Sequence, residues 1–241
     1  MSMRIPPPLA RLVYKGLGRV QWVAQTFANF QRPVPREYRD YDLSKVLRAH
    51  RLAVRLGENE EILDVGCGDG MLLRDLGLFR SFRRRVGVDL HRPESVPPEV
   101  EIQAYNGESL PFPDASFDSV VFAYFLHYLS RDHATRLLVE GCRVARKSVF
   151  VFDDSQAEWS FWYKARNHLE RLRSDILYRS LDPDRYRSSG DEEMYLTYRG
   201  WSELLEKLPR VTKVEVVPLD RISGLIHHTL FQAQLSANPG V

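Results

Sequence analysis

The chain has 241 residues, of which 44% are hydrophobic and 27% are charged, and its formal net charge is +2. These values are typical of a globular protein that buries one sizeable core, and they exclude a mainly disordered chain. They also give no bulk electrostatic reason to expect a nucleic-acid partner. The two cysteines, Cys67 and Cys142, are too few for a disulfide framework or a metal cluster, so no metal site is predicted.

The first 56 residues form a basic segment, with eleven Lys or Arg against three acids. We expect residues 1–56 to be a helical extension that serves as a lid, a docking surface or a solvated arm, with peripheral membrane contact as a further option. The segment lacks the apolar core of a secretory signal, and no run of 18 apolar residues could cross a membrane. The expected location is cytoplasmic. An Arg-rich organellar presequence is the alternative, because the first acid is Glu37.

From residue 61 onward, short apolar runs alternate with segments of helical periodicity. This alternation is typical of a parallel sheet that is covered by helices on both faces. We predict strands at 61–65, 85–90, 100–105, 117–125 and 148–153, with helices at 71–79 and 133–146.

The alternation is interrupted after the fifth predicted strand. A predicted helix at 157–181 and a polar loop at 182–193 come before the closing elements, which are a helix at 200–208 and strands at 211–219 and 227–235. We therefore predict one domain over residues 57–241, with a cap insert at about 155–198.

The first predicted strand ends in three glycines at alternate positions, Gly66, Gly68 and Gly70. A dinucleotide-binding turn has the pattern G-x-G-x-x-G, and its third glycine would fall on Met71. Two carboxylates, Asp64 and Asp69, would also repel a pyrophosphate. A ligand that carries an ammonium and a sulfonium but no phosphate would be attracted instead, and S-adenosylmethionine is such a ligand.

A second acid that can bind a nucleoside is Asp89, at the end of the second strand and 23 residues after Gly66. In a doubly wound sheet this position lies beside the turn of the first strand, where a carboxylate can accept hydrogen bonds from both ribose hydroxyls. NAD sites use the same contact, so Asp89 alone does not separate the two cofactor classes.

Three ordered motifs, ILDVGCGDG, VGVDL and NGESLPFPDASFDSVVFAYFLHYL, resemble the class I S-adenosylmethionine-dependent methyltransferases. The resemblance is to the methyltransferase type 11 group of mainly small-molecule enzymes, and it covers residues 60–153 and, more loosely, 198–235. It implies a doubly wound, Rossmann-like α/β sheet of seven strands, mostly parallel with the last strand antiparallel. It also implies S-adenosylmethionine as the cofactor.

The resemblance implies a role for each motif residue. Gly66 and Gly68 would let the methionine part of the cofactor approach the backbone, and Asp64 would help to hold its amino group. Asp89 would bind the ribose, and Leu90 would pack on the adenine face.

The third and fourth motif positions would contact the base and line the site. Asn106 stands where the family often has Asp, and its carbonyl could still accept from the adenine amino group. Gly107 would offer its backbone amide to the ring, and Tyr124 would line the wall of the cofactor site.

The candidates for catalysis follow the fourth and fifth strands. Methyl transfer from a sulfonium is an in-line displacement, so the protein must mainly align the acceptor and exclude water. A base is needed only where the acceptor must lose a proton, and His127 is suited to that role. Asp153 and its neighbour Asp154 could orient the histidine or bind substrate; capping of the next helix is the structural alternative.

The acceptor is predicted only as a class. The fourth strand lacks the Asn/Asp-Pro-Pro-Tyr turn of nucleic-acid amino methylases, and neither cysteine is placed as a nucleophile. The basic run at 83–85 lies at the amino edge of the sheet, where we interpret it as a solvated helix end. Four aromatic residues follow the fifth strand and could cap an apolar or aromatic substrate, with packing into the core as the alternative: Trp159, Phe161, Trp162 and Tyr163.

These observations favour a methyltransferase that acts on a small organic molecule, and they disfavour nucleic acid as the partner. Two alternatives stay open. One is an RNA methyltransferase that uses the basic amino-terminal segment, and the other is a non-catalytic module that binds S-adenosylmethionine.

Overall fold

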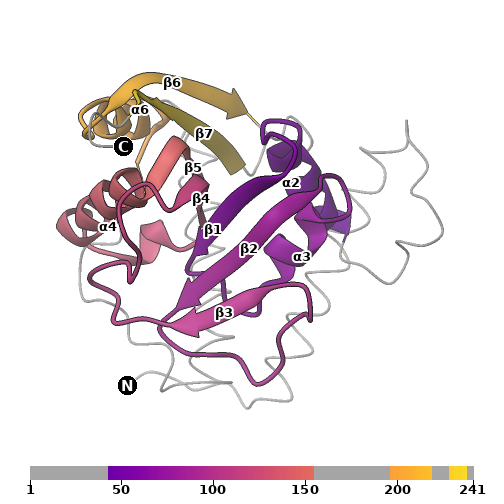
Figure 1. Cartoon of the computed structure of the whole chain (residues 1–241). Coiled ribbons are helices and arrows are strands. Elements are labelled where there is room, and N and C mark those ends of the chain that lie inside the picture. The colour runs from indigo at the N-terminus through magenta and orange to yellow at the C-terminus, as the bar shows by residue number, and fades with distance from the viewer. Residues whose placement is uncertain (1–42, 155–195, 219–227, 238–241) are drawn as a thin grey trace, which may run out of the picture.

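The computed structural model describes residues 43–154, 196–218 and 228–237. Within them lies one seven-stranded sheet in the order β3-β2-β1-β4-β5-β7-β6 (Figure 1). The strands are β1 (Glu60–Val65), β2 (Phe82–Asp89), β3 (Glu101–Ala104), β4 (Phe117–Ala123), β5 (Ala145–Asp154), β6 (Val211–Pro218) and β7 (His228–Leu235). The helices are α2 (Leu43–Ala53), α3 (Met71–Leu76), α4 (Arg131–Val144) and α6 (Tyr198–Glu206), with the short 3-10 helix η2 (Leu126–Tyr128).

The pairing of the strands confirms the predicted fold. Strands β1 to β5 run parallel to one another, whereas β7 is antiparallel to both β5 and β6. The chain winds from β1 outward to β2 and β3, and then returns to place β4 and β5 on the other side of β1. The strand order therefore reverses between β1 and β4, and ligands of doubly wound sheets bind beyond the carboxyl ends of the strands at such a point.

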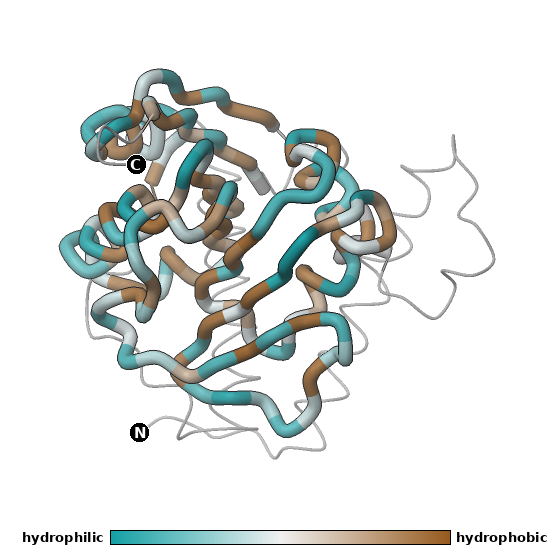
Figure 2. Tube along the Cα trace, viewed as in Figure 1, coloured by the Kyte–Doolittle hydropathy of each residue, from teal (hydrophilic) through white to brown (hydrophobic). Residues whose placement is uncertain are grey.

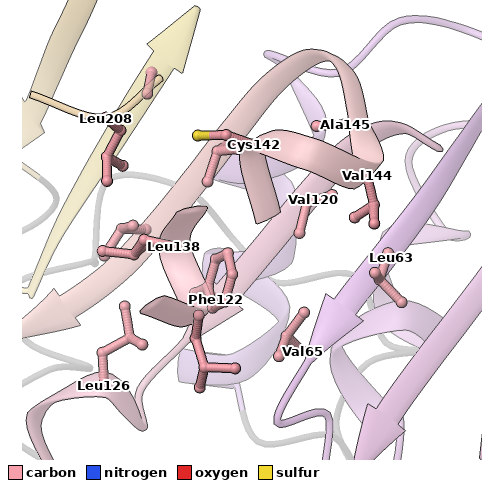
Figure 3. Close-up of a cluster of buried hydrophobic side chains, with 14 of the residues drawn as sticks. Leu63, Val65, Val120, Phe122, Leu126, Leu138, Cys142, Val144, Ala145 and Leu208 are labelled. Carbon is pink, nitrogen blue, oxygen red and sulfur yellow. The ribbon is translucent and has the colours of Figure 1, made fainter. Parts of the chain in front are cut away.

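Each face of the sheet carries its own cluster of buried hydrophobic residues. Figure 2 shows hydrophobic residues along the central strands. Helices α4 and α6 cover one face, where Val120 and Phe122 of β4 lie among Leu63 and Val65 of β1 and Cys142 of α4 (Figure 3). The other face packs against α2 and α3. The central strands β1 and β4 are almost fully buried, and they could be recognised from their apolar residues at 62, 63 and 65 and at 117 and 120–123.

Strand β2 begins earlier than predicted, and this corrects the interpretation of the arginine run at 83–85. The three arginines lie inside the strand, at its amino end, and do not form a helix end. Arg84 pairs with Glu101 of β3 at 2.8 Å, and the Arg85 guanidinium donates to the Leu73 carbonyl at 3.0 Å. The guanidinium groups of Arg84 and Arg85 therefore already have partners within the chain.

Some predicted elements lie outside the described residues. These are the first 42 residues, the insert at 155–195 with its aromatic residues, and the loop at 219–227. The end of the basic segment is described, and helix α2 buries Ala49 and Leu52 against the sheet. In the parts of the chain that the structure describes, no helix is long and apolar enough to cross a membrane.

Candidate functional site

The glycine turn after β1 is fastened to the end of β2. The backbone N–H groups of Gly66 and Cys67 both donate to the Val88 carbonyl, at 2.8 and 3.1 Å. Gly66, Gly68 and Gly70 all have positive φ angles, of 71°, 54° and 76°. A side chain would strain the backbone at each of these positions, so the sequence needs glycine here for the turn to form.

The first two glycines of the turn have different surroundings. A Cβ atom at Gly66 would lie 2.7 Å from the ring of Phe125, whereas a Cβ at Gly68 would meet no atom of the described residues within 4 Å. Gly66 is therefore required by packing inside the protein. Gly68 borders open space, so it is the position where a ligand can reach bare backbone.

Asp64 lies in β1, two residues before Gly66, and is 2% exposed. Its Oδ1 atom is buried and has no hydrogen-bond partner among the described residues. Burial raises the pKa of the Asp64 carboxyl well above its ordinary value, and the neighbouring Asp89 carboxylate raises it further. A buried polar atom without a partner costs free energy, so the site favours a donor or a cation that would approach this oxygen.

Asp89 ends β2 and is only partly buried. Its Oδ2 atom accepts the backbone N–H of Gly68 at 2.9 Å, and its Oδ1 atom accepts that of His91 at 3.3 Å. A carboxylate has about four acceptor positions, so two further hydrogen bonds remain possible. Asp89 thus both holds the turn and can accept hydroxyl groups from a ligand.

The loops after β2 and β3 meet beside Asp89. Leu90 is 57% exposed, and its Cδ2 atom lies 2.9 Å from where a Cβ would stand on Gly107, whose φ angle is +80°. Asn106 is exposed, and its Oδ1 atom accepts the backbone N–H groups of Glu108 and Ser109, at 3.0 and 3.1 Å. The residues expected to contact a base are therefore adjacent, but the Asn106 carbonyl already has two donors.

Tyr124 follows β4 with a φ angle of +59°, which is rare for a residue other than glycine. Its ring packs edge-on against Phe152, with centroids 4.7 Å apart, and the Arg48 guanidinium of α2 lies 4.3 Å from its centroid. The contact brings a cation from the basic segment to the carboxyl edge of the sheet.

The two candidates for catalysis are in direct contact. His127 Nδ1 lies 2.5 Å from Asp153 Oδ1, and the His127 backbone N–H donates to Asp153 Oδ2 at 3.2 Å. Both residues are buried, with exposed fractions of 5% and 0%. Asp153 thus fixes the orientation of the imidazole, and a carboxylate partner at Nδ1 places the ring proton there. The side chain of Asp154 lies outside the described residues.

Neither cysteine is placed for nucleophilic chemistry. Burial, together with Asp64 and Asp89, raises the pKa of the Cys67 thiol far above its ordinary value. Burial raises the pKa of Cys142 to about 12. Both thiols are therefore protonated near neutrality. The described residues contain no group of His, Cys, Asp and Glu that could hold a metal ion.

The sequence-predicted site residues all lie along the carboxyl edge of the sheet, at the ends of β1, β2 and β5 and on the segments that follow β1, β2, β3 and β4. Three contacts were not predicted: Phe125 against Gly66, Arg48 over Tyr124, and His133 of α4, whose Nε2 atom lies 2.7 Å from the Gly107 carbonyl oxygen. Only Arg48 had a signal in the sequence, since it belongs to the basic segment.

Residues 63–152 match a family model described as a methyltransferase domain. An uncharacterized methyltransferase of Schizosaccharomyces pombe is 35% identical over 94 residues, which cover 36% of this chain and 35% of that protein. The match therefore spans about a third of the length of that relative.

Solved structures show the same fold. A Haloferax volcanii protein solved in complex with the Trm112 methyltransferase activator has a TM-score of 0.57 and 15% identity, and the match covers 83% of this chain and 94% of that one. An S-adenosylmethionine-dependent methyltransferase of Methanosarcina mazei has a TM-score of 0.50 and 21% identity, with 78% and 98% covered. The chain is thus similar to these proteins across nearly their whole length.

Proposed function

We propose that this chain, whose residues 63–152 form a methyltransferase domain, transfers a methyl group from S-adenosylmethionine to a small organic acceptor. The observation that carries the proposal is the buried Asp64 oxygen, which has no partner among the described residues, beside Gly68, where those residues leave the turn open. This combination suits a cationic ligand without a phosphate, because a second anion would be repelled by Asp64 and Asp89.

The residues present fit such a cofactor. Asp64 would receive the ammonium group directly or through water, and Asp89 would accept the ribose hydroxyls while it holds the Gly68 amide. Leu90, which is largely exposed, would cover one face of the base. The bound cofactor supplies a methyl group on a positively charged sulfur. The protein then needs to align the acceptor with that methyl and to keep water out.

The pair formed by His127 and Asp153 supports proton removal from the acceptor. With the ring proton held at Nδ1 by Asp153, Nε2 of the neutral imidazole carries the lone pair that can take a proton. Asp153 stabilises the imidazolium that then forms, because the two groups are buried together. The acceptor atom would accordingly be an oxygen or a nitrogen that loses a proton on methylation.

Nothing in the described residues favours the two alternatives. The arginine run at 83–85 lies at the edge opposite the glycine turn, and Arg84 and Arg85 bind partners within the chain. The amino-terminal part of the basic segment lies outside the described residues, so a docking role for it stays a prediction, as does a cytoplasmic location.

The cofactor part of the proposal is tested by calorimetry with S-adenosylhomocysteine. We expect binding by the intact chain and a loss of at least about 100-fold in Asp89→Ala, since two charge-assisted contacts contribute roughly 1.5–3 kcal/mol each. Asp114→Ala is the matched control, because this exposed acid lies before β4 and pairs with Arg143 of α4. Binding of NADH with none of S-adenosylhomocysteine would contradict the proposal.

The acceptor is found by incubating the intact chain with labelled S-adenosylmethionine and a metabolite extract. A labelled small molecule that Asp89→Ala fails to produce would support the proposal. Label that enters only RNA from the same extract would contradict the small-molecule acceptor and favour the RNA methyltransferase alternative.

A further inference from the structure

The Asn106 side chain has a defined orientation. Two backbone N–H groups, those of Glu108 and Ser109, converge on one terminal atom of its amide at 3.0 and 3.1 Å. An amide nitrogen has only hydrogens to offer, so the atom that accepts both must be the oxygen. The other terminal atom is consequently the NH₂ group, and no described residue accepts a hydrogen bond from it.

A contact from helix α4 reinforces this orientation. His133 Nε2 lies 2.7 Å from the Gly107 carbonyl, and because a carbonyl only accepts, the Nε2 atom carries the proton. The same peptide group carries the Glu108 N–H that donates to Asn106 Oδ1. A donor on the carbonyl side of a peptide polarises its N–H, so the two hydrogen bonds strengthen each other. A flipped amide would direct its NH₂ group at two N–H donors.

The orientation has a consequence for the base. An Asp at this position could accept the backbone N–H groups with one oxygen and an exocyclic amino group with the other. Asn106 accepts the backbone donors in the same way but presents only N–H groups beyond them. An amino group on the base is also a donor, so the two cannot form a hydrogen bond.

We propose that Asn106 meets position 6 of the cofactor purine with a donor, so that the site does not select for the 6-amino group of adenine. The inference rests on the proposed function, because it assigns a specificity to the same cofactor site. It replaces the expectation that the Asn106 carbonyl accepts from the adenine amino group. Adenine would be held by stacking on Leu90 and by the Gly107 amide, together with the ribose contacts of Asp89.

The experiment compares two ligands on three proteins by calorimetry. The ligands are S-adenosylhomocysteine and its hypoxanthine analogue, S-inosylhomocysteine, in which an acceptor oxygen replaces the 6-amino donor. We expect the intact chain to bind the two within about tenfold of each other. In Asn106→Asp the preference for the adenine ligand should rise by at least about tenfold, because the new oxygen accepts from the amino group and repels the carbonyl.

The quantity compared between proteins is the ratio of the affinities for the two ligands, so effects of the ligand change that are the same in every protein cancel. Hypoxanthine also carries a proton at N1, but that change faces the Gly107 backbone in every variant and cancels in the ratio. His133→Ala should weaken both ligands to a similar extent, since it loosens the loop without changing the polarity of the Asn106 amide. Asn59→Asp, a change of the same type before β1, should alter neither ligand.

The outcomes separate the inference from the proposed function. Binding of S-adenosylhomocysteine with a ratio that changes less than about threefold in Asn106→Asp would overturn the inference alone. A ratio that rises equally in His133→Ala would also overturn it, because loop order would then set the preference. Failure of the intact chain to bind either ligand would overturn the proposed function and the inference with it.

Discussion

The two edges of the sheet treat their charged residues in opposite ways. At the amino edge, acids at the strand starts are paired with cations: Asp118 with Arg146 at 3.3 Å and with Lys147 at 3.1 Å, and Glu101 with Arg84 at 2.8 Å. At the carboxyl edge, Asp64 is buried with an oxygen that no described residue pairs. These acids at the amino edge have cationic partners within the chain, whereas the carboxyl edge offers a ligand an acceptor that no described residue uses.

The pKa values follow the same division. Partial burial opposes ionisation of Asp118, but hydrogen bonds from Arg146, the Glu61 N–H and Lys147 outweigh it and lower its pKa to about 2. Burial raises the pKa of Asp64 instead, and no cation among the described residues offsets it. Structural ion pairs and ligand sites both perturb acids, and the direction of the change distinguishes them here.

The largest expected effect lies at the carboxyl edge. His127→Gln keeps a donor for Asp153 but cannot take a proton, so turnover with the acceptor found in the extract should fall by about 10²–10⁴-fold. Affinity for S-adenosylhomocysteine should not change, and initial rates with calorimetry measure the two quantities. His50→Gln, an exposed histidine of α2, is the matched control. Full turnover by His127→Gln would remove the histidine from the mechanism.

At the amino edge the expected loss is in stability. Arg146→Ala leaves Glu61 and the largely buried Asp118 without their guanidinium partner, so the free energy of unfolding should fall by roughly 2–3 kcal/mol. Urea unfolding measures this change, and calorimetry should find the affinity for S-adenosylhomocysteine unaltered. Arg199→Ala, which removes an exposed pair with Glu203 on α6, should leave the free energy of unfolding almost unchanged. Weakened cofactor binding in Arg146→Ala would contradict the conclusion that the amino edge contributes to stability alone and the carboxyl edge to binding.

Removal of the buried charge at the carboxyl edge should have the reverse pattern. In Asp64→Asn the affinity for S-adenosylhomocysteine should fall about thirtyfold, or roughly 2 kcal/mol, because the ammonium loses a charged partner. The free energy of unfolding of the ligand-free protein near pH 8 should stay the same or rise by about 1 kcal/mol, since a desolvated carboxylate is removed. A clear loss of stability with unchanged affinity would assign Asp64 a purely structural role.

The sheet was predictable because its central strands are buried on both faces. The strands β1 and β4 carry apolar residues at 62, 63 and 65 and at 117 and 120–123, and the glycine turn marks where β1 ends. The start of β2 was not predictable in the same way. Its first residues include Arg83 and Arg84, which lie in a strand because Glu61 and Glu101 of the neighbouring strands pair with them. Such cross-strand pairing is not visible in a single run of sequence.

The site was predictable as a set of residues but not as a set of contacts. Parallel strands place Asp64, Asp89 and His127 at one edge, and this follows from the order of the elements. Whether an acceptor at that edge is free depends on competition from nearby backbone donors. The Asn106 carbonyl accepts from two such donors, whereas Asp64, near the end of β1, keeps an oxygen that no described residue pairs.

The smallest expected effect is the dependence on pH, and it separates the two edges in one protein. The lowered pKa of Asp118 contributes stability that is fully present above about pH 4 and is lost as the pH falls toward 2, by on the order of 1 kcal/mol. The raised pKa of Asp64 has the opposite sign: the folded state keeps a proton that the unfolded state has released. Stability therefore declines as the pH rises from about 4 to the raised value.

Cofactor affinity should increase over the same range in which Asp64 lowers stability, because the ammonium group binds the ionised carboxylate. Unfolding and calorimetric titrations between about pH 3 and pH 8 measure both quantities. Asp118→Asn should flatten only the acid limb of the stability curve, and Asp64→Asn should flatten only the rise in affinity and the decline in stability above it. If Asp118→Asn changed the pH dependence of binding, the amino edge would be coupled to the ligand, and the two edges could no longer be regarded as independent.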